Sequence, residues 1–141
     1  MLQEKPIFSI VIPTLNEEIY LPRLLEDLAK QTFHSFEVII VDAESEDETQ
    51  KRAQNFKKKF QKFRFLTTSK KNVSHQKNTG GLAAEGQYII FMDADNQIPQ
   101  NFLQKLEEKI RDPKPDIFTC WSKADSKHTS EISIAALFNF I

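Results

Sequence analysis

Strand-like and helix-like segments alternate along most of the chain, and this alternation is the feature that most limits the folds available to it. The strand-like segments are short apolar runs, whereas apolar residues recur every three or four positions in the helix-like segments. Strands are expected at residues 7–12, 36–41, 63–67, 88–92 and 116–121, and helices at 20–31, 46–60, 73–85 and 101–110. This order predicts an α/β protein, a three-layer α/β/α sandwich with a mainly parallel sheet and helices on both faces.

The composition is that of a single globular domain over residues 1–141. Hydrophobic residues make up 40% of the chain and charged residues 28%, as is ordinary for a soluble protein. The formal net charge is -1, so no bulk field draws the chain toward nucleic acid or anionic lipid. Cys120 is the single cysteine, which excludes an internal disulfide framework and a cysteine metal cluster.

Local signals mark the expected helices. Ser45, followed by Glu48 three residues later, forms a capping box that predicts the start of the second helix. Gly86 is suited to the position just after the helix over 73–85. Residues 51–71 carry many lysines and arginines and no acid, and we interpret them as a solvated helix face. No aromatic-rich reading surface accompanies them, so nucleic acid is not an expected partner.

Carboxylates follow three of the expected strands. Glu17 comes after the first strand, Asp42 directly after the second, and Asp93 and Asp95 directly after the fourth. The carboxyl ends of parallel strands share one edge of a sheet, where ligands bind in open α/β folds. Like charges gathered at such an edge destabilise the fold unless they are paired or given a cation. We therefore expect a ligand site at this edge.

The Asp93-x-Asp95 pair is the most informative part of this edge. Two carboxylates on a tight loop can reach one Mg²⁺ or Mn²⁺ ion, which prefers oxygen ligands and shares them with substrate phosphates. Such an ion would neutralise a diphosphate leaving group. Lys77 is a candidate cation for a phosphate or a base, or else a solvated surface group. Gly80 and Gly81, inside a helical pattern, indicate close packing on the sheet, close approach to a nucleotide, or both.

Several other site classes lack their motifs. The sequence contains no Gly-x-Ser-x-Gly element, no Walker A loop and no Gly-x-Gly-x-x-Gly fingerprint. These absences weigh against a serine hydrolase, a P-loop protein and a dinucleotide oxidoreductase. A nucleotidyltransferase would want a glycine-rich loop after the first strand, where residues 13–16 read Pro-Thr-Leu-Asn instead.

Four segments, taken in order, resemble a known family. They are residues 9–18 (SIVIPTLNEE), 41–49 (VDAESEDET), 77–80 (KNTG) and 91–95 (FMDAD). Together they resemble the family 2 glycosyltransferases, inverting enzymes of the GT-A fold, over about residues 6–100. The resemblance implies a transfer of sugar from a nucleotide-diphosphate donor, most often a UDP-sugar, to an acceptor hydroxyl with the help of Mn²⁺ or Mg²⁺.

The resemblance also implies roles for individual residues. Asp42 would accept the N–H of the base, Thr14 and Glu17 would line the base and ribose pocket, and Asp95 would bind the metal. Lys77 stands where the family often has arginine, and it lacks the planar fork of that side chain. The implied nucleotide-binding set is Pro13, Thr14, Asn16, Glu17, Asp42, Lys77, Asp93 and Ala94, and the implied metal set is Asp93 and Asp95.

The catalytic base is not assigned. The family places a catalytic aspartate well beyond the metal motif, and nothing after Asp95 matches its context. We therefore expect the chain to end before the part that completes catalysis, with residues 122–141 as a weakly packed tail. The alternative is a non-catalytic nucleotide-binding or interaction module derived from the same fold. The acceptor, whether glycan, lipid or protein, is left open.

The ends of the chain bear on its location. The N-terminus lacks the apolar stretch of a signal peptide, and no run reaches the length of a membrane span. We expect a cytoplasmic protein, with the inner face of the membrane as an alternative location. The apolar residues 132–141 are expected to form a helix, or else a peripheral membrane contact. A tail of this kind without its partner also predicts either self-association or disorder.

Overall fold

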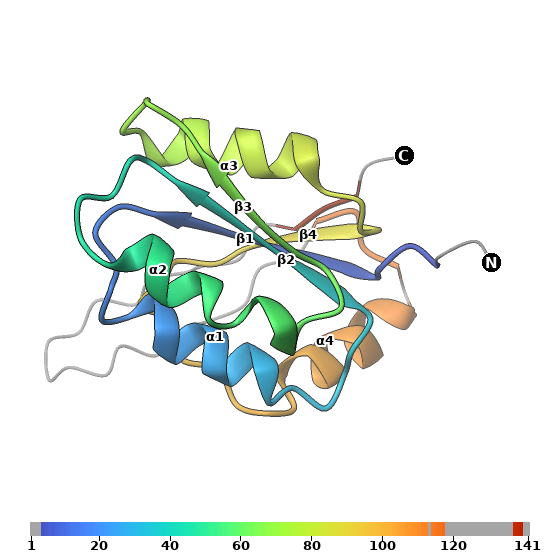
Figure 1. The fold of residues 1–141 in the computed structure, drawn as a ribbon. Coiled ribbons are helices and arrows are strands. Elements are labelled where there is room, and N and C mark those ends of the chain that lie inside the picture. The colour runs from blue at the N-terminus through green and yellow to red at the C-terminus, as the bar shows by residue number, and fades with distance from the viewer. Residues whose placement is uncertain (1–3, 113, 118–136, 140–141) are drawn as a thin grey trace, which may run out of the picture.

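The computed structural model of the protein describes residues 4–112, 114–117 and 137–139, and these form a layered α/β structure (Figure 1). Its sheet has the strand order β3-β2-β1-β4-β5. The first four of these strands are parallel, and β5 runs antiparallel to β4. The strands are β1 (Phe8–Thr14), β2 (Phe36–Asp42), β3 (Phe63–Thr67), β4 (Tyr88–Phe91) and β5 (Leu137–Asn139). The expected α/β class and mainly parallel sheet are confirmed.

Helices cover both faces of this sheet. Helix α3 lies on one face, and α1, α2 and α4 lie on the other (Figure 1). The helices are α1 (Leu21–Ala29), α2 (Thr49–Gln54), α3 (Val73–Ala83) and α4 (Phe102–Arg111), with a short 3-10 helix, η1 (Lys57–Lys59), after α2. The three-layer arrangement is therefore confirmed. None of the helices in the described part of the chain has the length and hydrophobicity of a membrane span.

The alternation of side chains along the strands builds a core on each face. Phe8, Ile10 and Ile12 of β1 pack into the larger core with the buried leucines of α1. Val11, between them, points to the opposite face and packs with Ile39, Val41 and Ile89 under α3. Each fully buried aliphatic side chain contributes about 1.5–3 kcal/mol. The two central strands β1 and β2, which are buried along their whole length, are thus covered on both sides.

The second helix differs from its prediction. It was expected from residue 46 to about residue 60, but α2 covers only Thr49–Gln54 and Lys57–Lys59 forms the separate 3-10 turn. Asn55 is a weak helix former, and three adjacent lysines repel one another. The capping box is also wrong, because Ser45 does not cap α2; Asp47 accepts the Thr49 N–H instead, at 2.9 Å.

Only some of the predictions for the C-terminal part of the chain fall on described residues. Asp116 and Ile117 lie in a bend, and residues 118–121 of the expected fifth strand, with Cys120, lie outside the described residues. The strand next to β4 is instead β5, from residues 137–139. The helix expected over 132–141 is therefore wrong at these residues. The rest of that segment, and the tail over 122–136, lie outside the described residues.

Two glycines bring α3 and its exit loop close to β1. A Cβ on Gly80 would overlap Cγ1 of Val11 and lie 3.1 Å from Cγ2 of Val41. Gly86 does not follow the helix end directly, since α3 ends at Ala83. Its amide donates to Ser9 Oγ at 2.8 Å, and a Cβ there would lie 2.7 Å from the Ser9 nitrogen. Close packing on the sheet, one of the two interpretations of the glycine pair, is confirmed for Gly80.

The neighbouring glycines Gly80 and Gly81 make a matched test of this packing. Gly80→Ala should lower the free energy of unfolding by about 1–3 kcal/mol, because the added methyl group overpacks α3 against the sheet. Gly81→Ala is the control. Its Cβ would lie 3.7 Å from Phe91 Cζ, an ordinary contact, so the better helix propensity of alanine should raise stability by up to about 1 kcal/mol. Urea unfolding followed by circular dichroism measures both, and equal effects of the two substitutions would contradict the prediction.

Candidate functional site

The loops that follow β1, β2 and β4 meet at the carboxyl edge of the sheet (Figure 1). Thr14 and Asp42 are register partners at the ends of β1 and β2. Just beyond β4, the Met92 amide donates to the Val11 carbonyl at 3.0 Å, which keeps the following Asp93 loop beside β1. As expected, the backbone therefore brings the carboxylates predicted from the sequence to one edge of the sheet.

Asp42 is the most firmly held of these carboxylates. Only 3% of its surface is exposed, and that of Thr14 is 2% exposed. Its Oδ1 accepts the Thr14 hydroxyl at 2.7 Å and the Ser45 hydroxyl at 2.6 Å, and its Oδ2 accepts the Ser45 amide at 2.8 Å. A charged acceptor binds these groups more strongly than a neutral one would. This explains why Ser45 turns toward Asp42 and not toward the helix that follows.

The loops after β1 and β2 are joined by reciprocal hydrogen bonds. The Asn16 amide donates to Ser45 Oγ at 2.8 Å, and the Asn16 side-chain oxygen accepts the Glu46 amide at 2.9 Å. The Glu17 amide donates to Thr49 Oγ1 at 2.8 Å. Asn16 and Glu44 adopt left-handed backbone angles, with φ of 56° and 54°, which cost free energy for residues other than glycine. The paired loops hold this strained geometry in place.

Several carboxylates lie beside these two paired loops. Burial raises the pKa of Glu17 above its ordinary value, and the carboxylates of Asp95, Asp47 and Asp93 raise the pKa further. The Asp95 side chain is exposed, and Asp93 is half-buried. Lys77, from α3, places its ammonium nitrogen 3.5 Å from Asp93 Oδ1. Within the described residues no three ligating side chains are grouped to hold a metal ion alone, so a cation here would need oxygen ligands from elsewhere.

Two members of the predicted set occupy the interior. Pro13 is buried within β1, and Ala94 is 3% exposed and belongs to the larger core. Their side chains thus support the loops from beneath, and any contact of Ala94 with a ligand would come from its main chain. The structure therefore brings Thr14, Asn16, Glu17, Asp42, Lys77, Asp93 and Asp95 to one edge.

Sequence reasoning missed two residues that shape this edge. Gln76 is 3% exposed and donates from Nε2 to the carbonyl oxygens of Thr14 and Val41, both at 2.8 Å. Asp47 accepts the Glu18 amide at 3.1 Å, and it also binds Thr49. A polar residue four positions before Gly80, on the face of α3 that must pack on the sheet, is the signal that could have identified Gln76.

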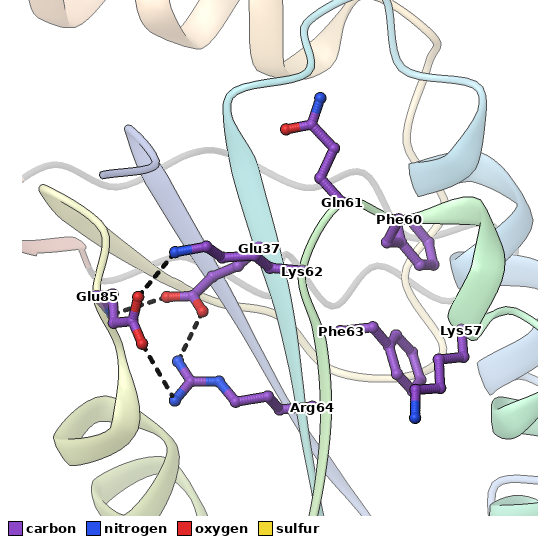
Figure 2. Close-up of a pocket in the computed structure, with 8 residues that line it drawn as sticks. All are labelled: Glu37, Lys57, Phe60, Gln61, Lys62, Phe63, Arg64 and Glu85. Atoms are coloured by element: carbon purple, nitrogen blue, oxygen red, sulfur yellow. Dashed lines mark hydrogen bonds and ion pairs between the residues drawn. The ribbon is translucent and has the colours of Figure 1, made fainter. Parts of the chain in front are cut away.

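A shallow pocket beside β3 lies at the opposite, amino end of the strands (Figure 2). Its charged groups already pair with one another. Buried Glu37 accepts the Arg64 guanidinium at 2.6 Å and the Ser9 hydroxyl at 2.6 Å, while Lys62 binds Glu85 at 2.8 Å. These contacts stabilise the sheet, and we do not assign a ligand site to this pocket.

The raised pKa of Glu17 predicts a pH dependence of stability. In the unfolded chain its carboxyl has the ordinary pKa of 4.5, so the folded protein keeps this proton to higher pH than the unfolded chain does. Ionisation of Glu17 therefore opposes folding as pH rises above 4.5, and it has no effect in acid, where the carboxyl is protonated in both states. Glu17→Gln should be more stable than the unaltered chain at neutral pH, and the difference should disappear as pH falls below 4.5.

Urea unfolding across this pH range measures the difference. Added salt should reduce the part that comes from the neighbouring carboxylates, since screening weakens interactions between exposed charges. A stability difference that stays constant with pH would show that the substitution acts through packing and not through charge.

Comparison of the chain with known proteins identifies its family. The family model described as glycosyl transferase family 2 matches residues 9–139. The uncharacterized glycosyltransferase EpsJ of Bacillus subtilis (strain 168) is 30% identical over 115 residues, which make up 82% of this chain and 33% of EpsJ. The poly(ribitol-phosphate) beta-N-acetylglucosaminyltransferase TarS of Staphylococcus aureus (strain Mu50 / ATCC 700699) is 33% identical over 113 residues, 78% of this chain and 20% of TarS. The chain thus spans a third or less of the length of these relatives.

Comparison of the fold with solved structures points to the same family. The crystal structure of S. aureus TarS 1-349 in complex with UDP-GlcNAc matches with a TM-score of 0.81 and 27% sequence identity, over 87% of this chain and 36% of that chain. The resemblance seen in the four sequence segments is therefore confirmed by the family model, by the relatives and by the fold. The chain belongs to glycosyl transferase family 2, and its sheet and helices have the arrangement of a GT-A fold.

Proposed function

We propose that this chain binds the nucleotide part of a sugar donor, a UDP-sugar first of all, at the carboxyl edge of β1, β2 and β4. The observation that supports this most directly is the Thr14–Asp42–Ser45 group, which presents a buried carboxylate at the end of β2. TarS, a relative with the same fold, has been solved with UDP and with UDP-GlcNAc.

The hydrogen bonds of Asp42 leave room for one more donor. A carboxylate has about four acceptor positions, two on each oxygen. Thr14 and Ser45 occupy both positions of Oδ1, and the Ser45 amide takes one of the two on Oδ2. The remaining position suits a single N–H group, such as N3–H of uracil. Because Asp42 is held from three directions, it would meet the base without reorganisation.

Asp93 and Asp95 are the proposed ligands of a Mn²⁺ or Mg²⁺ ion. The residues fit such an ion, because Glu17, Asp93 and Asp95 concentrate negative charge that only Lys77 is seen to offset within the described part of the chain. A hard divalent ion shared with the diphosphate would complete its ligand set with phosphate oxygens and stabilise the departing diphosphate. Lys77 would then bind either Asp93 or a phosphate oxygen.

The reaction we propose is transfer of the sugar to an acceptor hydroxyl, with inversion at the anomeric carbon. We assign no described residue to the acceptor site or to the role of catalytic base. The alternative is a nucleotide-binding module without turnover. Incubation with UDP-sugars, Mn²⁺ and mixed hydroxyl acceptors, followed by assay of released UDP, separates the two, because only a complete enzyme releases UDP faster than the protein-free control.

Asp95 is the residue on which metal-dependent binding should depend. We expect UDP to bind more tightly with Mn²⁺ than without it, and Asp95→Asn to abolish most of this difference, since the amide loses the charge that a divalent ion requires. Isothermal titration calorimetry with and without Mn²⁺ measures the effect. Asp112→Asn, at the end of α4, is the matched control and should bind like the unaltered chain. Failure of UDP, and then of GDP and dTDP, to bind would favour an interaction module.

Asp42→Asn should affect binding in a different way. The substitution keeps the shape but replaces one acceptor oxygen with an amide donor, and each lost charged hydrogen bond is worth about 1.5–3 kcal/mol. We expect UDP affinity to fall by roughly ten- to hundredfold both with and without Mn²⁺. A loss confined to the Mn²⁺-containing titration would place Asp42 in the metal site and contradict its assignment to the base.

A further inference from the structure

Helix α3 buries only two of its residues against the sheet. Gln76 and Gly80, four positions apart and thus on one face, are its buried residues. Gly80 lets the helix axis come close to Val11 and Val41. Asn72 fixes the start of the helix by accepting the His75 amide at 2.9 Å. The register of α3 against β1 and β2 is therefore set at two points, and Gln76 is the one nearer the carboxyl edge.

Both amide hydrogens of Gln76 are used at this edge. Nε2 donates to the carbonyl oxygens of Thr14 and Val41, each at 2.8 Å. These carbonyls belong to adjacent strands. One is that of Thr14, the register partner of Asp42, and the other is that of Val41, which precedes Asp42. In a site that is 3% exposed, the lost hydrogen bonds would not be replaced readily by water. Gln76 thus clamps the two strand ends at the point where they present Asp42.

The next residue on the same helical turn is Lys77, 3.5 Å from Asp93. A single turn of α3 therefore contacts the ends of β1 and β2 through Gln76 and the loop after β4 through Lys77. A shift of this turn would therefore disturb both the Lys77–Asp93 ion pair and the contacts of Gln76 with the carbonyl oxygens of Thr14 and Val41.

We propose that Gln76 is a positioning residue of the nucleotide site, and that it sets the selectivity for the base by fixing Thr14 and Asp42. This inference rests on the proposed function, because it concerns the same nucleotide. Gln76 itself touches no substrate in this scheme. Its effect passes through the two carbonyl oxygens to the carboxylate that would accept the N–H of uracil.

The test uses UDP and UDP methylated at uracil N3, which lacks the N–H that Asp42 would accept. Calorimetry with Mn²⁺ gives the Kd of both ligands for each variant. The unaltered chain should prefer UDP by roughly tenfold or more. In Gln76→Met, which keeps the length of the side chain but has no donor, this preference should fall to about threefold or less, mostly through weaker UDP binding.

Gln31→Met is the matched control. Gln31 is also buried, 2% exposed, and its Nε2 also donates to two carbonyl oxygens, those of Asp27 and Pro99. These partners lie outside the candidate site. Gln31→Met should lower the melting temperature as Gln76→Met does, yet keep the full preference for UDP. A loss of stability alone would affect Gln76→Met and Gln31→Met alike. The ratio of the Kd of the methylated ligand to the Kd of UDP, measured for each variant, therefore separates a positioning role from an effect on folding.

The outcomes are distinct. No binding of UDP by the unaltered chain overturns the proposed function and this inference with it. Binding without preference over the methylated ligand overturns the role of Asp42 and of Gln76. A folded Gln76→Met with unchanged preference overturns the inference alone. If Gln76→Met does not fold, Gln76→Asn takes its place, because its shorter side chain cannot reach both carbonyls, and unchanged preference in that variant is equally decisive.

Discussion

The side-by-side register of β1 and β2 is the constraint on which the rest of the site depends. It places Thr14 opposite Asp42, so that a hydroxyl meets a carboxylate where both strands end. The buried apolar residues of both strands hold this register, because a slip by one residue would turn every side chain to the wrong face. The loops that follow inherit their positions from it, and their reciprocal hydrogen bonds through Asn16 and Ser45 are possible only in this register.

The order of elements and the residues at the carboxyl edge could be predicted from the sequence, since both follow from patterns that are local. Apolar runs and 3.6-residue periods mark strands and helices, and parallel strands bring Asp42 and Asp93 to one edge whatever the details of packing. The ion pair between Lys77 and Asp93 did not follow from these patterns. The sequence patterns did not reveal the role of Asn16, whose amide and side-chain oxygen join the loops after β1 and β2.

The failures share a cause in competition between local and tertiary interactions. Ser45 and Glu48 have the spacing of a capping box, but the Asp42 carboxylate, brought close by the turn through Glu44, binds Ser45 more strongly. The spacing of Gln76 from Gly80 could place it on the buried face of α3, but not reveal its partners, which are 62 and 35 residues away. The antiparallel β5 depends on the edge of β4, which the apolar character of residues 132–141 does not reveal.

The charged network around Glu37 has a consequence for the behaviour of the protein in solution. In the described sheet β3 is the outermost strand on its side, and an open strand edge can pair with another chain. Lys62 and Arg64 stand at the beginning of that strand, each tied to a carboxylate and partly exposed to water (Figure 2). A second chain that paired along β3 would have to strip water from these ion pairs. The same contacts that anchor the edge strand thus discourage its growth into an aggregate.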